Sequence, residues 1–302
     1  MQTPAWHEQP VVFDCEGCRL IGIVTLPETN AEAGVIIVVG GPQYRAGSHR
    51  QFTLLARHLA HQGIASIRFD YRGMGDSEGD MRNFENVDAD IRAAIDALMQ
   101  RVPTVSRVAL WGLCDAASAA LYYGHTDTRV SDLILLNPWV HSPAGAARAR
   151  IKSYYITRLL HKSFWKKLLA GQFRFGNSVR DLAKSVQLAH TDATSVNNAP
   201  ADHRHGSAGY VGRMLSGLQR FSGGVLLLLS GNDLTAQEFI SLCERDKQWN
   251  KMLQHKHICQ YFVDGANHTF SSQLWRNSVA NWTSKWLEKS GAKRHPHERR
   301  LP

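Results

Sequence analysis

The chain has 302 residues, of which 43% are hydrophobic and 20% charged, a composition typical of a globular protein rather than a disordered or fibrous one. It holds no run of about 18 apolar residues, so the sequence predicts no membrane-spanning helix. The first residues, MQTPAWHEQPVVF, lack a basic start followed by an apolar run, and we expect no signal peptide. Five cysteines in a chain of this length suggest a cytoplasmic, reduced protein rather than a disulfide-bonded one.

The net charge of +9 is concentrated in one segment of the chain. Residues 141–220 hold thirteen Lys and Arg against three Asp and Glu, a net charge of +10. All other residues together hold 22 Lys and Arg against 23 Asp and Glu, a net charge of −1. This asymmetry indicates that 141–220 is a structural unit of its own.

The first part of the chain reads as a hairpin followed by alternating strands and helices. Residues 11–27 form two apolar stretches around a turn at Glu16 and Gly17, which predicts the hairpin. The apolar, β-branched run GVIIVVGG predicts a strand that is buried on both faces. The same patterns predict helices at 49–63 and 86–101, with a strand at 64–71 between them.

The alternation continues to the end of the chain. Strands are expected at 107–113, 130–138, 223–233 and 257–265, and helices at 115–124, 235–249 and 272–290. Alternating elements predict an α/β fold with a mostly parallel, doubly wound sheet. We expect one core, 1–140 and 221–290, a helical cap inserted at 141–220, and a flexible tail at 291–302.

Cys114 lies at the predicted joint between a strand and a helix. Gly112-Leu113-Cys114-Asp115-Ala116 has the spacing of a nucleophile elbow, with small residues where the strand and helix pack closely. In open α/β sheets, ligands bind beyond the carboxyl ends of strands, where this cysteine is placed. The following helix N-terminus would stabilise a thiolate. The alternative is that Cys114 is a small, buried core residue.

A nucleophile needs a base and a group that orients the base. For this elbow the expected order along the chain is nucleophile, acid and then His. Asp233 follows one apolar strand and His268 follows the last strand, so both are expected at the same edge of the sheet as Cys114. Asp264 is the rival acid, four residues before His268 on the same loop. The alternatives are that Asp233 is a turn former and His268 one loop histidine among fifteen.

Two stretches at strand ends resemble the α/β-hydrolase superfamily: DYRGMGDSEG, starting at Asp70, and VVGGPQYRAGSHRQF, in the region of the oxyanion loop. This resemblance covers nearly the whole chain except the basic segment. GGPQYRAGSHRQF, GLCDAASAALYY and the Tyr-Tyr and FWKKLL of the cap resemble the exosortase A system-associated hydrolase 1 family. That group has Cys where most relatives have Ser, and the resemblance implies acyl or polysaccharide chemistry near the cell envelope.

The resemblance also suggests the donors of an oxyanion hole. The N–H of Gly41 is the first choice, by analogy with the Gly-Gly-Pro loops of related peptidases; Pro42 has no N–H, and Gln43 is second. The other donor is the N–H of Asp115, the residue after the nucleophile. The Asp115 carboxylate either lies near the thiolate, where it would oppose ionisation, or caps the first turn of the helix, which we favour.

Other chemical motifs carry less weight. Cys15 and Cys18 have C-x-x-C spacing without a second pair, and the histidines of His203-Arg204-His205 lie in a polar stretch, so no metal or cofactor is expected. In the cap, Arg158, Lys162 and Lys166 recur opposite an apolar row of a helix. This stripe is either a solvated lid face or a surface for an anionic membrane or partner, and nucleic acid is not expected.

The sequence therefore predicts an enzyme that hydrolyses or transfers an acyl group from an ester or thioester through Cys114, His268 and Asp233. The expected substrate is a small acyl compound, with acyl-CoA or an acyl carrier protein as candidate donors. Two alternatives stay open: a peptidase-like amidase, and a binding protein that keeps the fold without chemistry. The expected location is cytoplasmic. Through its basic cap, the protein could also contact the inner membrane peripherally.

Overall fold

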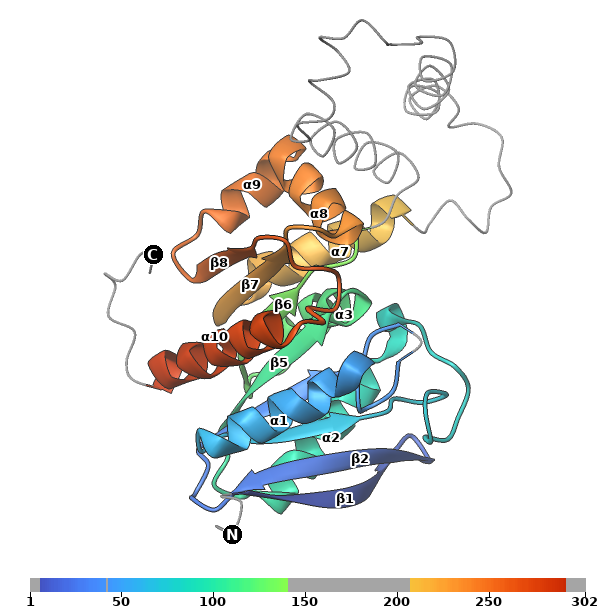
Figure 1. Cartoon of the computed structure of the whole chain (residues 1–302). Coiled ribbons are helices and arrows are strands. Elements are labelled where there is room, and N and C mark those ends of the chain that lie inside the picture. Colours follow the sequence, from blue (N-terminus) through green and yellow to red (C-terminus); the bar gives the residue numbers. More distant parts are fainter. Residues whose placement is uncertain (1–5, 42, 141–206, 292–302) are drawn as a thin grey trace, which may run out of the picture.

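An eight-stranded sheet, in the order β1-β2-β4-β3-β5-β6-β7-β8, forms the centre of the molecule (Figure 1). The structure is a computed structural model that describes residues 6–41, 43–140 and 207–291. The strands are β1 (Trp6–Cys15), β2 (Cys18–Pro27), β3 (Ala33–Val38), β4 (Ala65–Phe69), β5 (Arg107–Leu113), β6 (Val130–Leu136), β7 (Gly224–Ser230) and β8 (Ile258–Val263). β2 runs antiparallel to β1 and β4, and every other neighbouring pair is parallel.

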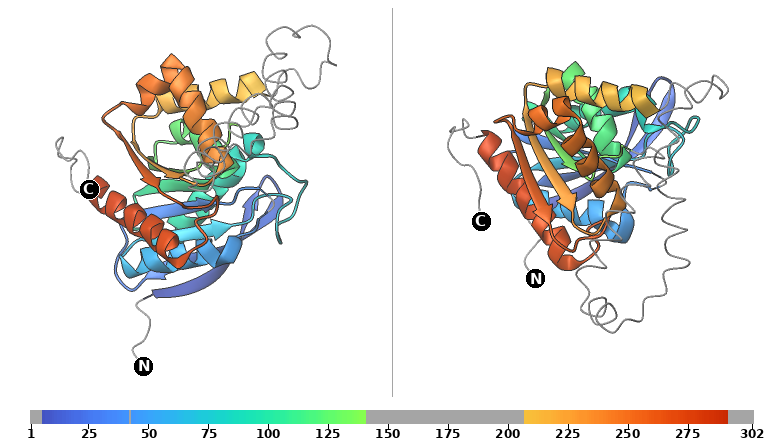
Figure 2. Two further views of the ribbon diagram at one scale, coloured as in Figure 1. Left: turned by 45° about the horizontal axis from the view of Figure 1, so that its top comes forward. Right: turned by 90° about the horizontal axis from the view of Figure 1, so that it is seen from above.

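Helices cover both faces of the sheet, as the alternating pattern predicted (Figures 1 and 2). The described helices are α1 (Gln51–His61), α2 (Asp88–Arg101), α3 (Asp115–Tyr123), α7 (Ser207–Arg220), α8 (Leu234–Arg245), α9 (Lys247–Leu253) and α10 (Gln273–Gly291). Short 3-10 turns lie at Ser48–Arg50, Phe84–Asn86 and Gly124–Thr126. α1 and α10 lie side by side on one face, and α2, α3 and α7 lie on the other. The predicted α/β fold with a mostly parallel sheet is confirmed.

The predicted N-terminal hairpin is confirmed by the register of β1 and β2. Cys15 pairs with Cys18 across a two-residue turn, in which Glu16 and Gly17 both have positive φ angles, 51° and 81°. Two positive φ angles match the turn type that fits the twist of a hairpin. The central strands β5, β6 and β7 are buried on both faces, as their continuous apolar sequences require.

The single helix predicted at 235–249 was wrong, because two helices occupy this stretch. α8 ends at Arg245, and α9 begins at Lys247 after Asp246, which has an extended backbone. The Asp246 carboxylate accepts hydrogen bonds from the N–H groups of Gln248 and Trp249, at 2.8 and 3.1 Å. An aspartate that caps a new helix N-terminus in this way ends the previous helix.

The last fourteen residues of the predicted cap, Ser207–Arg220, form α7 and pack against α3. The Tyr122 hydroxyl donates to the Tyr210 carbonyl over 3.1 Å, and Met214 and Leu218 are buried. These residues therefore belong to the helical layer over the sheet. The rest of the predicted cap, with its basic stripe and His203-Arg204-His205, lies outside the described residues, and so does 292–302 of the predicted tail.

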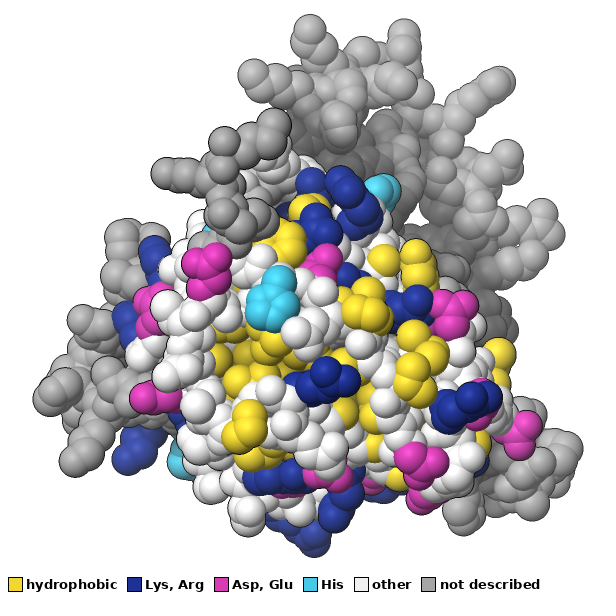
Figure 3. All heavy atoms as spheres, turned by 90° about the horizontal axis from the view of Figure 1, so that it is seen from below, with side chains coloured by type: hydrophobic (Ala, Val, Ile, Leu, Met, Phe, Trp, Pro, Cys, Tyr) yellow, Lys and Arg dark blue, Asp and Glu magenta, His cyan; other side chains and the backbone are white. Residues whose placement is uncertain are grey.

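Charges are mixed over the part of the surface that can be seen. Figure 3 shows one face on which Lys and Arg side chains are interspersed with Asp and Glu. This fits a chain whose excess positive charge falls in 141–220. Within the described ranges, no helix has the length and hydropathy needed to cross a bilayer.

Gly112 lets α3 pack directly on β5, and we expect a single methyl group added at this position to lower the stability of the protein strongly. A Cβ at Gly112 would lie 2.5 Å from the backbone carbonyl carbon and oxygen of Ala116. We expect Gly112→Ala to lower the free energy of unfolding by about 3 kcal/mol, measured by urea denaturation. Gly212→Ala in α7 is the matched control, because a Cβ there meets nothing within 4 Å and helix propensity favours Ala by about 1 kcal/mol. Equal effects of the two substitutions would contradict the packing argument.

Candidate active site

Cys114 occupies a strained turn between β5 and α3. Its backbone angles, φ 62° and ψ −124°, lie in a region that residues other than glycine rarely adopt. Its N–H donates to the Leu136 carbonyl over 2.9 Å, and its carbonyl accepts from the N–H of Trp139 over 3.2 Å. These bonds fix the turn to the end of β6. Cys114 stays partly exposed.

Two glycines make room for this turn. Besides Gly112, Gly40 at the end of β3 lies so close that a Cβ there would be 2.6 Å from the Leu113 carbonyl oxygen. Ala116, which stands where many elbows have a second glycine, is buried in the contact and still fits. The glycines are therefore required by close approach of the backbones rather than by the chemistry of the site.

Asp233 and His268 meet at the same edge of the sheet. Asp233 follows β7 and caps α8, where its carboxylate accepts from the N–H groups of Thr235 and Ala236, at 3.4 and 3.1 Å. The Nδ1–H of His268 donates to Oδ2 of Asp233 over 2.9 Å. The Asp233 side chain is only 8% exposed, whereas the rival acid Asp264 is exposed on the loop before His268. The imidazole is thus bound to the predicted acid in this structure.

His268 also contacts the Cys114 side chain, and both partners act on its protonation. The hydrogen bond to Asp233 raises the pKa of His268 most, the neighbouring Cys114 side chain raises it further, and burial lowers it, which gives a pKa of about 10. Both partners therefore favour the protonated imidazole in the folded protein. The structure brings Cys114, His268 and Asp233 together in one connected row of side chains.

The Asp115 carboxylate reaches across to the loop after β3. Its Oδ2 accepts from the N–H of Gly41 over 2.9 Å, and its Oδ1 accepts from the N–H of Ala116 over 3.0 Å. Burial raises the pKa of Asp115, while these two backbone hydrogen bonds lower it. The carboxylate thus contacts the first turn of α3, as favoured from the sequence. It also bonds the loop amide, which the sequence did not reveal.

This contact changes the roles expected for the loop after β3. The N–H of Gly41, the first choice for an oxyanion donor, has the Asp115 carboxylate as its partner in this structure. Gln43, the second choice, holds the loop through its side chain, because its Oε1 accepts from the N–H of Ser48 over 3.1 Å. An oxyanion at Cys114 can use Gly41 only after Asp115 releases it.

Asp70, the residue after β4, anchors the same loop. Its fully buried carboxylate accepts from the backbone N–H of Arg45 over 2.6 Å and pairs with the Arg45 guanidinium. The N–H of Asp76 donates to it over 3.2 Å, which closes the turn of DYRGMGDSEG. The motif that carried the superfamily resemblance therefore positions the loop and takes no direct part in the site.

Asn137 and Ser230 hold the backbone of the histidine loop, and sequence reasoning missed both. The Asn137 amide donates to Ser230 Oγ over 2.8 Å and to the His268 carbonyl over 3.1 Å. The Ser230 hydroxyl donates to the Asn267 carbonyl over 3.0 Å, and both side chains are fully buried. The available signal was a polar residue directly after an apolar run in LILLNP and LLLLSGND.

Both cysteines of the C-x-x-C motif lie in the hairpin, where Cys15 ends β1 and Cys18 begins β2. Burial raises the pKa of Cys15 to about 11, while Cys18 is partly exposed. Within residues 6–41, 43–140 and 207–291, no group of three or more His, Cys, Asp or Glu side chains has the arrangement of a metal site.

Comparison with known proteins places the chain in a family. It is similar to the Pyrococcus furiosus esterase Pf2001 (TM-score 0.62, 14% identity, 96% of this chain and 94% of that one) and to Est1E from Butyrivibrio proteoclasticus with bound ferulic acid (TM-score 0.61, 15% identity, 94% and 100%). A polyketide transferase, grgF, from a Penicillium species is 31% identical over 102 residues, about a third of either chain. Residues 30–271 match the model of the serine aminopeptidase S33 family (Hydrolase_4). The chain therefore belongs to this family and is an α/β-hydrolase enzyme.

Proposed function

We propose that Cys114 is the nucleophile of an enzyme that hydrolyses or transfers acyl groups from esters or thioesters. His268 would act as the base and acid, and Asp233 would hold the imidazole. The observation that carries the proposal is the hydrogen bond of His268 to Asp233, with the Cys114 side chain beside the imidazole at the elbow. The imidazole beside the sulfur is the group that can exchange a proton with the nucleophile and with the leaving group.

The proposed reaction has two steps. The Cys114 thiolate attacks the carbonyl carbon, an S–C bond forms, and the leaving alkoxide or thiolate takes a proton from His268. Water or another acceptor then attacks the thioester and gives its proton to His268, and the Cys114 thiolate leaves. In each tetrahedral intermediate the N–H of Asp115 would serve the oxyanion, with Gly41 after its release by Asp115, or with Gln43.

Transfer to an acceptor other than water is a second candidate outcome of the same chemistry. It is favoured by the partial similarity to a polyketide transferase, and a thioester intermediate suits exchange between thiol carriers such as acyl-CoA or an acyl carrier protein. The resemblance of GLCDAASAALYY to the exosortase-associated group suggests an exopolysaccharide context, and the basic cap suggests contact with an anionic membrane. A peptidase-like amidase and a non-catalytic binding protein are the alternatives that the experiments must exclude.

Trapping the acyl-enzyme tests the proposal directly. After incubation with a panel of acyl esters and thioesters, intact-mass measurement should show one acyl group, mapped to Cys114 and absent from Cys114→Ala. Adding candidate acceptors then separates hydrolysis from transfer. If the wild type forms no adduct and turns over no member of the panel while small peptide amides are cleaved, the enzyme is an amidase and the ester proposal fails.

Substitutions in the row of three side chains should differ in severity. We expect Cys114→Ala and His268→Ala to lower kcat by at least about 10³-fold. The loss in Asp233→Asn should be about 10- to 100-fold smaller, because the asparagine amide oxygen can still accept from the Nδ1–H of His268 and hold the imidazole. Asp264→Asn is the matched control and should retain activity, since Asp264 is exposed. A greater loss in Asp264→Asn than in Asp233→Asn would contradict the assignment of the acid.

The five cysteines should react with iodoacetamide in a defined order. At neutral pH we expect alkylation of Cys114 first and slower alkylation in His268→Ala, measured by peptide mass spectrometry over time. Burial raises the pKa of Cys243 to about 12 and protects that thiol. Cys259 is the internal control, because it is partly exposed like Cys114 but lies on β8, away from the elbow. Equal rates for Cys114 and Cys259 would argue against an activated thiol.

The raised pKa of His268 also predicts a pH dependence of stability. The pKa is about 10 in the folded protein against an ordinary 6.5, so the stability from the protonated imidazole is complete below pH 6.5 and is lost as pH rises through about 10. Between pH 7 and pH 10, the free energy of unfolding in urea should therefore fall more in the wild type than in His268→Ala. Parallel pH dependences in the two proteins would show that the imidazole is not held as a cation.

A further inference from the structure

β8 is an edge strand of the sheet, because within the described residues only β7 pairs with it (Figure 1). The Val263 carbonyl at its end faces β7 and accepts from the N–H of Gly231 over 2.9 Å. Backbone groups of successive residues point to alternate sides of a strand, so those of Gln260 and Phe262 point away from β7. An edge that presents N–H and C=O groups in this way can pair with a strand of another chain.

The two edges of the sheet differ in how they are protected against such pairing. β1, at the other edge, contains Pro10, which has no N–H, and the charged residue Glu8. β8 has the sequence ICQYFV and contains neither a proline nor a charged residue. Its Phe262 is 56% exposed. Proline and charge are common means of keeping an edge strand unpaired, so β8 is the edge that remains able to pair.

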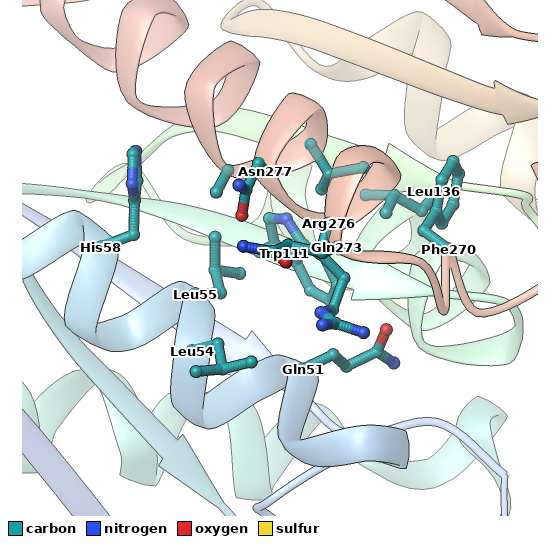
Figure 4. A pocket seen from close by; sticks show the side chains of 12 residues that line it. Gln51, Leu54, Leu55, His58, Trp111, Leu136, Phe270, Gln273, Arg276 and Asn277 are labelled. Carbon is teal, nitrogen blue, oxygen red and sulfur yellow. The ribbon is translucent and has the colours of Figure 1, made fainter.

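Aromatic side chains continue this edge onto both faces of the sheet. On one face Tyr261 stacks on Trp282 of α10, with ring centroids 4.9 Å apart and planes inclined by 4°, and both residues are partly exposed. Another side of α10 faces α1, where Asn277 helps to line a cavity of about 240 Å³ (Figure 4). Phe262 lies on the opposite face of β8 from Tyr261, because successive side chains alternate. A partner that pairs with β8 would therefore also cover apolar surface on both faces.

The charges at the two ends of β8 are complementary. Lys256 lies in the turn before the strand and Asp264 in the turn after it, and both are exposed. Six strand residues span about 20 Å, so the two side chains cannot pair within one chain. If two copies pair their β8 strands antiparallel, each Lys256 lies beside the partner's Asp264. A parallel pair would instead bring like charges together, which is unfavourable.

We propose that the β8 edge binds a second copy of this chain, as an antiparallel pair of β8 strands with a twofold axis at Gln260. A twofold interface uses the same patch of both subunits and must be complementary to itself, as the charges at the ends of β8 are. Gln260 would exchange both backbone hydrogen bonds with the partner's Gln260. The Phe262 N–H would donate to the partner's Ile258 carbonyl. The two sheets then form one continuous sheet.

The molecular mass of the full chain in solution tests this proposal. In sedimentation equilibrium between about 1 and 200 µM, the mass should rise from 33.8 kDa toward twice that value. Phe262→Lys places a charge in the apolar part of the interface and should raise the dissociation constant of the dimer by at least about tenfold. Val12→Lys is the matched control, because Val12 is an apolar residue, 61% exposed, on the other edge strand.

Charge reversal tests the direction of pairing. Lys256→Glu and Asp264→Lys should each weaken the dimer by about tenfold, because each creates two pairs of like charges across the interface. Combining the two substitutions should restore the affinity, since the opposite charges then face each other again. Lys285→Glu is the control with the same change of net charge, at an exposed position on α10.

A mass of 33.8 kDa at every concentration would overturn the proposal. A dimer that Phe262→Lys leaves intact, or a double charge reversal that binds no more tightly than the single ones, would overturn it as well. Circular dichroism checks the fold of each variant, and the substituted side chains are exposed, so the fold should tolerate the changes. Cys114→Ala should dimerise like the wild type. The readout is mass and not turnover, so the result is independent of the proposed function of Cys114.

Discussion

The close packing of α3 on β5 is the contact on which the site depends. Gly40 and Gly112 allow backbones to approach to distances that a Cβ would prevent, and the chain turns through Cys114 at φ 62°. The turn leaves the sulfur at the carboxyl edge of the sheet. Because β5 to β8 are parallel neighbours, the residues that follow β7 and β8 reach the same edge. Asp233 and His268 therefore meet Cys114 although they are far away in the sequence.

The charged side chains around Cys114 have partners that come from different strands and loops. The His268 imidazole is hydrogen-bonded to Asp233. Burial raises the pKa of Asp115, and the positive charge of His268 acts against this by lowering it. Asp115 in turn binds the Gly41 amide. The loop after β3, the elbow and the histidine are thus electrostatically linked, and formation of an oxyanion at Cys114 would have to compete with the Asp115 carboxylate for Gly41.

Patterns local in sequence could be predicted, whereas contacts made by single polar side chains could not. The alternation of strands and helices, the hairpin at Glu16 and Gly17, and the elbow at Cys114 follow from periodicity and spacing over a few residues. The break at Asp246 was missed because the apolar periodicity continues across it, and the sequence does not show that Asp246 adopts the extended backbone from which its carboxylate caps the next helix. The roles of Asn137 and Ser230 depend on which carbonyls pass nearby, which the tertiary structure alone decides.

The central claim is that Asp233 and the neighbouring Cys114 side chain hold the His268 imidazole in its protonated form, and the protonation of this imidazole tests the claim most directly. Nitrogen-15 NMR of the histidine side chains can follow His268 from pH 6 to pH 11 in the wild type and in Cys114→Ala, with His268→Ala to assign its signals. The account predicts that His268 is fully protonated at pH 8 in the wild type and titrates near pH 10, and that its pKa is lower in Cys114→Ala. A neutral imidazole at pH 8, with the same pKa in both proteins, would contradict it.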